Sequence, residues 1–129
     1  MANKEQQELI VTGLAAVALG AGSGFALLPK LMGRAFGMNK AGAEQAGSMV
    51  AVRGLGVRDF AFGLGLLLAR KNSESRSLLL KLLAFCMAGD TFACFMAMRK
   101  PEAKFTTFLG GVASIATGVV AWIASQNEE

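Results

Sequence analysis

Three long stretches of this chain contain almost no charged residues, and they restrict the possible folds more than any other feature. Leu9 to Leu28 and Phe105 to Ser125 contain no charge, and Leu82 to Met98 contains only Asp90. An α-helix that crosses a bilayer needs about 20 predominantly apolar residues. The first two stretches meet that length outright, and the third meets it with one interruption. The pattern therefore predicts membrane-spanning helices.

A fourth stretch, Ser48 to Arg70, has the composition of a span but carries Arg53, Arg58 and Asp59 inside it. Counting it, we expect a single all-α domain over residues 1–129, an integral membrane four-helix bundle. The expected spans cover residues 8–28, 45–70, 77–98 and 102–125. The chain would then be a multi-pass protein whose principal partner is the lipid bilayer.

The alternative is a soluble helical bundle with unusually apolar helices. Only 17% of the residues are charged and the mean hydropathy is +0.48. Helices of a soluble bundle keep a polar stripe on one face, which Leu9–Leu28 and Phe105–Ser125 lack. The net charge of +4 lies in the expected loops, where anionic lipid headgroups are its natural partner. No basic helix face with interleaved aromatic residues is present, so we expect no nucleic-acid binding.

Local signals indicate where the helices begin and end. Pro29 should end the first helix, and residues 30–36 mix basic and apolar side chains as a short interfacial segment does. Residues 37–42 are expected to form a turn. Ser73 or Ser75 is the expected N-cap of the third span, and Pro101 is suited to the first turn of the fourth.

Small residues recur at helical spacing on two expected spans, and this pattern lets helices approach closely within a bilayer. The first set is Gly13, Ala16, Gly20 and Gly24, and the second is Gly110, Ser114 and Gly118. The three charges of the second span also point in different directions around its axis. A second copy of the chain could cover the polar side that one bundle leaves open, so we expect a homo-oligomer.

The charges inside the second span predict a polar centre. Each charged residue near the middle of a lone span costs about 2.5–3.5 kcal/mol, and the three together cost roughly 8 kcal/mol, more than the roughly 4.5 kcal/mol that the apolar residues of this helix offset. If the second and third spans are antiparallel across a short loop, Arg58 lies at the depth of Asp90. The same counting places Ser114 of the fourth span near that depth. Arg53 is shallow enough to extend toward the membrane surface.

The residues expected at a metal or redox centre are missing. There is no histidine, and Cys86 and Cys94 lie about 12 Å apart along one helix, too far for a disulfide. We therefore expect no metal and no cofactor, and interpret both thiols as packing residues.

The sequence Arg53-Gly54-Leu55-Gly56-Val57-Arg58-Asp59-Phe60-Ala61-Phe62-Gly63, followed one span later by Asp90, resembles a domain-of-unknown-function family of small four-span membrane proteins. The shared pattern is Gly-x-Arg-Asp-x-x-x-Gly in the second span and an acid in the third. The resemblance covers nearly the whole chain. It implies a four-helix membrane fold and implies no activity.

Three functions remain open for the polar centre formed by Arg53, Arg58, Asp59, Asp90 and Ser114. The favoured one is a structural role or the binding of a lipophilic small molecule. The second is a membrane enzyme in which Asp59 and Asp90 act as acid and base while Arg58 holds an oxygen. The third is a small proton-coupled transporter. An arginine beside each acid disfavours the transporter, and the lack of a cofactor or nucleophile motif disfavours the enzyme.

Overall fold

The computed structural model describes residues 4–36, 38–99 and 104–127, and the regular elements in these ranges are all helical. Four long helices are α1 (Lys4–Leu27), α4 (Ala46–Leu68), α5 (Ser73–Ala97) and α6 (Lys104–Gln126). Shorter elements complete the order along the chain. These are α2 (Pro29–Ala35), α3 (Lys40–Glu44) and the 3₁₀ turn η1 (Ala69–Lys71).

Three of the helical segments are long and apolar enough to cross a membrane. They are Glu5–Leu27, Ser73–Ala97 and Thr107–Gln126, which confirms three of the predicted membrane-length helices. Helix α4 has a similar length, but every 18-residue stretch of it contains Arg53, Arg58 and Asp59. Its charges, and not its length, separate it from the other three.

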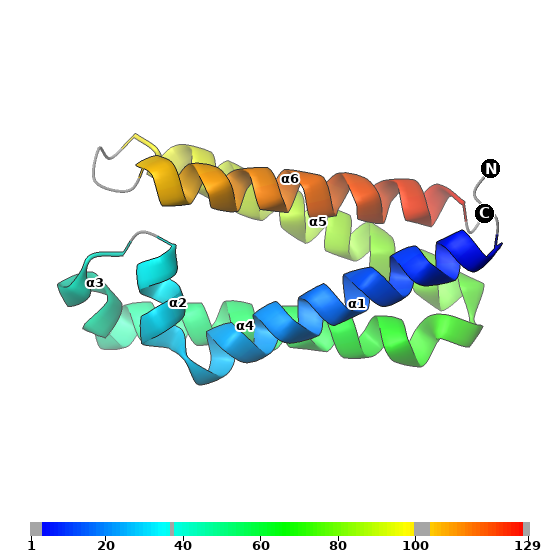
Figure 1. Cartoon of the computed structure of the whole chain (residues 1–129), viewed down its shortest axis with the longest axis horizontal. Helices are drawn as coiled ribbons and strands as arrows, with labels where there is room; N and C mark the ends of the chain where they lie inside the picture. The colour runs from blue at the N-terminus through cyan, green and yellow to red at the C-terminus, as the bar shows by residue number, and fades with distance from the viewer. Residues whose placement is uncertain (1–3, 37, 100–103, 128–129) are drawn as a thin grey trace.

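The four long helices are arranged as two pairs. Helix α1 packs along α4, and α5 packs along α6, while contacts between the pairs are few (Figure 1). The pairs meet at the end of the molecule where α1 begins and α6 ends. Toward α2 and α3 they diverge, so the space between them widens along the molecule.

Glycines bring α1 and α4 together. A Cβ atom at Gly63 would lie 2.7 Å from Cγ of Leu19 and 2.8 Å from the backbone oxygen of Ala15. A Cβ at Gly56 would lie 2.7 Å from the backbone oxygen of Gly22, and one at Gly22 would meet the same segment of α4. No side chain larger than hydrogen fits at these positions without separating the helices.

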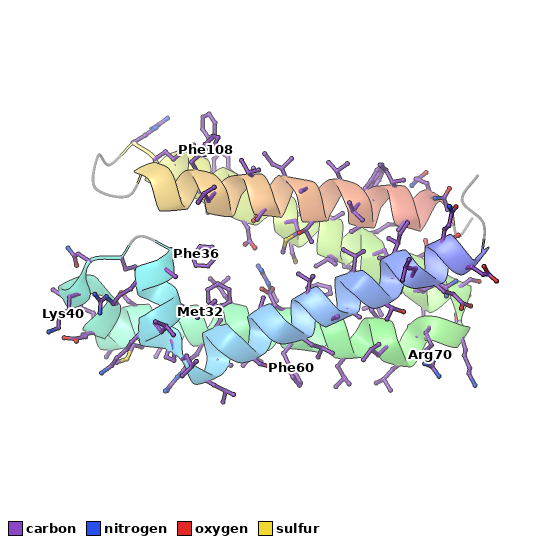
Figure 2. The ribbon with its side chains drawn as sticks, in the orientation of Figure 1. Met32, Phe36, Lys40, Phe60, Arg70 and Phe108 are labelled. Atoms are coloured by element: carbon purple, nitrogen blue, oxygen red, sulfur yellow. The ribbon has the colours of Figure 1, made fainter. Side chains whose placement is uncertain are left out.

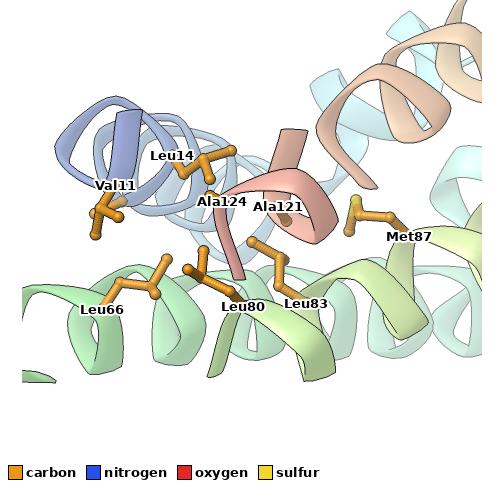
Figure 3. Packing of buried hydrophobic residues seen from close by; sticks show 9 residues of the cluster. Val11, Leu14, Leu66, Leu80, Leu83, Met87, Ala121 and Ala124 are labelled. Carbon is orange, nitrogen blue, oxygen red and sulfur yellow. The ribbon is translucent and has the colours of Figure 1, made fainter. Parts of the chain in front are cut away.

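The two pairs are held together where they meet by a small apolar core (Figure 3). Its buried members are Val11, Leu14, Ala15, Leu66, Leu80, Leu83, Met87, Ala121 and Ala124. All four long helices contribute to it. Two hydrogen bonds reinforce this end: the Gln7 amide donates to the Ala124 carbonyl at 3.2 Å, and the Ser77 hydroxyl donates to the Ser125 carbonyl at 3.4 Å. The closed end therefore anchors one helix pair to the other.

Several local predictions need correction. Pro29 does follow the end of α1, and it begins α2. The N-cap of α5 is Asn72, whose side chain accepts a hydrogen bond from the Ser75 amide at 3.0 Å; neither Ser73 nor Ser75 caps the helix. The expected turn over 37–42 instead contains the start of α3, capped by Asn39. Pro101 lies outside the described residues.

The predicted packing of small residues is only partly correct. Gly118 lies against α5, where an added Cβ would be 3.1 Å from Cβ of Met87. On α1, an added Cβ at Gly13 or Gly20 would have no atom of the described chain within 4 Å. Helix α1 uses Gly22 to approach α4, so the face with Gly13 and Gly20 stays uncovered within one chain.

Candidate functional site

Arg58 lies near the middle of α4 and reaches from one helix pair to the other. Its side chain extends toward α5, where Asp90 occupies the matching depth. The loop between α4 and α5 is short, and both helices rise equally per residue, so positions at equal distance from the loop lie level. The predicted pairing of Arg58 with Asp90 is confirmed.

The guanidinium of Arg58 binds both nearby carboxylates. Nη1 donates to Oδ1 of Asp90 at 3.0 Å and Nη2 donates to Oδ2 at 2.6 Å, a bidentate pair across the two helices. Nε and Nη2 also donate to Oδ1 of Asp59, at 3.0 and 2.8 Å. Adjacent residues point in different directions on a helix, but the long arginine side chain folds back far enough to reach its neighbour. We call Arg58, Asp59 and Asp90 the polar cluster.

The polar cluster forms one wall of a cavity between the two helix pairs. The cavity has a volume of about 370 Å³, at the small end of the range for ligand pockets. The cluster is only partly covered, since 27%, 15% and 28% of the side-chain surface of Arg58, Asp59 and Asp90 remains exposed. Charged atoms therefore face an open space and are not sealed inside packed protein.

Apolar side chains from every long helix form most of the remaining wall. The lining residues on α1 and α6 include Leu14, Val17, Ala18, Ala21, Phe25, Gly110, Ala113 and Thr117. Those on α4 and α5 include Val52, Leu55, Leu83, Met87, Ala93 and Cys94. Within the described ranges, the polar cluster supplies the only charged groups of the lining. The cavity thus combines a largely apolar lining with one charged cluster on its wall.

Phe36 borders the cavity toward its wide end. Helix α2 folds back so that the ring of this residue lies between α2 and α6 (Figure 2). The ring centre is 5.1 Å from that of Phe25 on α1, with the planes tilted by 50°. A Cβ added at Gly110 of α6 would be 3.1 Å from the Phe36 ring. Phe36 therefore bridges the two helix pairs where they diverge.

The other predicted site residues fall into two groups. Ser114 lines the cavity, as its predicted depth required, without a hydrogen bond to the polar cluster. Arg53 is exposed on α4 and does not line the cavity, so the structure does not bring it to the site. The sequence interpretation missed Phe36 because its position depends on how α2 folds back. The only sequence feature that could have pointed to Phe36 is that it is an aromatic residue at the end of the short amphipathic segment.

The two thiols are separated as expected and lie in different surroundings. Cys94 lines the cavity, whereas Cys86 does not. In the part of the chain that the structure describes, no three His, Cys, Asp or Glu side chains gather as metal ligands. The site offers a guanidinium held by two carboxylates, beside a largely apolar chamber.

Comparisons with protein-family models, with curated proteins and with solved structures found no match to this chain. The function must therefore be inferred from the geometry of the cavity and its polar cluster.

Proposed function

We propose that this chain is a four-span integral membrane protein that binds a small lipophilic molecule in the cavity between its two helix pairs. The observation that carries the proposal is the cavity itself, whose largely apolar wall includes the partly exposed polar cluster. Ligand pockets characteristically combine an apolar lining with a few fixed polar groups that orient the ligand. Ionisable side chains deep within a span are costly, and they usually serve function.

Inclusion of α4 as the fourth span is supported by its packing. Helix α4 runs along α1, one of the membrane-length helices, and contacts it through Gly56 and Gly63. Its central charges are turned toward the cavity, where Arg58 pairs with Asp90 of α5. Pairing removes most of the penalty that an isolated charge would carry in the bilayer. Helix α4 can then cross the membrane as part of the bundle, though not alone.

A purely structural role is the second candidate, because the Arg58–Asp90 pair joins the two helix pairs. An ion pair that served only to hold the helix pairs together would be strongest if packed side chains enclosed it. The exposure of the cluster to a cavity favours binding over a structural role alone. The enzyme and transporter alternatives require a carboxylate that can exchange protons, whereas Arg58 engages both Asp59 and Asp90.

The proposal can be tested with two probes of the same shape in native mass spectrometry. They are 4-phenylbutyltrimethylammonium and its neutral carbon isostere, (5,5-dimethylhexyl)benzene. Ala113→Phe should fill the cavity, while Ala116→Phe places the same ring on a part of α6 outside the lining. We expect at least one probe to bind the wild type and Ala116→Phe at one per chain, and to bind Ala113→Phe at least tenfold more weakly. If neither of these probes, nor the anionic analogue 4-phenylbutanesulfonate, distinguishes the two variants, the cavity is not a ligand site.

A further inference from the structure

The polar cluster holds one more acid than base. Arg58 contributes one positive charge, and Asp59 and Asp90 contribute two negative charges when ionised. No other charged side chain from the described ranges lines the cavity, and the charged residue nearest along α4, Arg53, lies outside it. With both carboxylates ionised, the polar cluster therefore gives the cavity wall a negative excess, in surroundings where an uncompensated charge is costly.

The hydrogen bonds show where this excess is concentrated. Arg58 donates to three of the four carboxylate oxygens: both oxygens of Asp90 and Oδ1 of Asp59. The second oxygen of Asp59, Oδ2, accepts none of these bonds. Asp90 thus forms a bidentate pair with the guanidinium, while Asp59 has one carboxylate oxygen that accepts no hydrogen bond from Arg58.

The rest of the lining is suited to the apolar body of a ligand. Phe25 and Phe36 place two aromatic rings in the wall, toward the wide end of the cavity. Met38, Met87 and Cys94 add polarisable sulfur atoms. An anionic ligand would face two carboxylates, and the one guanidinium is already bound to them.

We infer that the cavity selects a small lipophilic monocation, such as an amine or quaternary ammonium compound, whose positive group is held by Asp59 beside the Arg58–Asp90 pair. This inference rests on the proposed function, since it specifies the charge of the molecule that the cavity takes. The cation neutralises the excess carboxylate, and its apolar body occupies the chamber toward Phe36.

The test compares three probes of similar size and different charge. They are 4-phenylbutyltrimethylammonium, (5,5-dimethylhexyl)benzene and 4-phenylbutanesulfonate, each titrated by native mass spectrometry against the wild-type protein. Only binding that Ala113→Phe removes and Ala116→Phe retains is counted as cavity binding. We expect the cation to bind at least tenfold more tightly than the neutral and anionic probes. If the neutral or anionic probe binds within threefold of the cation or better, the charge inference is wrong while the proposed function stands.

The Asp59→Asn variant then tests whether Asp59 is the residue that gives the cavity its preference for a cation. The substitution keeps the shape of the side chain, removes the excess charge and leaves both partners of the Arg58–Asp90 pair in place. We expect the preference for the cation over the neutral probe to fall to threefold or less. A preference that persists in full in this variant would assign selectivity to another group and overturn the inference. The three-probe comparison on the wild type decides the charge preference even if the variant does not fold.

Discussion

Replacing Gly63 with alanine should weaken the pairing of α1 with α4. The added Cβ would lie 2.7 Å from Cγ of Leu19 and 2.8 Å from two backbone atoms of α1, the Ala15 oxygen and the Leu19 nitrogen. Backbone atoms cannot rotate away, so the helices must separate by roughly 0.7 Å to restore an ordinary contact, and such a gap forfeits a quarter to a half of the local dispersion attraction. Overpacking of this kind costs about 1–3 kcal/mol, and we expect the upper half of that range.

Gly54→Ala provides the matched control on the same helix. An added Cβ there has no atom of the described chain within 4 Å, so the substitution should be neutral or should stabilise the helix by up to about 1 kcal/mol. The free energy of unfolding of both variants can be measured by SDS titration in one fixed detergent, followed by circular dichroism. Gly63→Ala should be the less stable by about 2–3 kcal/mol, because both variants share the helix-propensity gain and only Gly63→Ala carries the overpacking cost. If the two variants differ by less than about 0.5 kcal/mol, α4 does not pack against α1 through this face.

Arg58→Leu and Asp90→Leu should each destabilise the protein by about 3–5 kcal/mol. The double variant should lose at least about 1 kcal/mol less than the sum of the two single losses. Additive losses in the unfolding assay would show that the two residues are not in contact. Asn72→Ala should cost about 1 kcal/mol through the lost cap of α5 while Ser73→Ala costs little, and equal thermal shifts would contradict the observed cap. Gly20→Leu, on the uncovered face of α1, should lower the oligomer fraction in native mass spectrometry without a loss of unfolding free energy, and an unchanged size would exclude that face as the oligomer interface.

The pairing of Arg58 with Asp90 could be predicted from the sequence because it depends on few quantities. Two helices with the same rise per residue and a short connection place these residues at equal depth. The high cost of a lone charge within an apolar span makes a partner necessary. Neither argument requires knowledge of side-chain packing, so both work from one sequence.

The choice between competing glycine faces could not be made in the same way. Helix α1 carries small residues on more than one side, and the set with Gly13 and Gly20 has the more regular spacing. The structure uses Gly22 against Gly56 of α4 instead. Which small residues form the contact depends on the rotation of each helix. The other helices and the apolar core together determine that rotation, so it cannot be predicted from the spacing of residues within one helix.

The cavity could not be predicted from the sequence either. It exists because the helix pairs meet at one end and diverge at the other, with α2 folding back to place Phe36 between them. The sequence indicated that residues 30–36 form a short amphipathic segment, and the short helix α2 lies over most of this range. Its direction depends on the break at Leu28 and on contacts with residues distant in the chain, such as Gly110.

The most direct test of the ligand site is a crystal structure grown from a lipidic mesophase with 4-phenylbutyltrimethylammonium present. We predict density for the probe between the α1–α4 and α5–α6 pairs, with its ammonium group beside Asp59 and the Arg58–Asp90 pair intact. A well-ordered structure in which side chains fill the space between the pairs, or in which the probe lies only on the outer, lipid-facing surface, would contradict the proposal that this cavity binds a ligand.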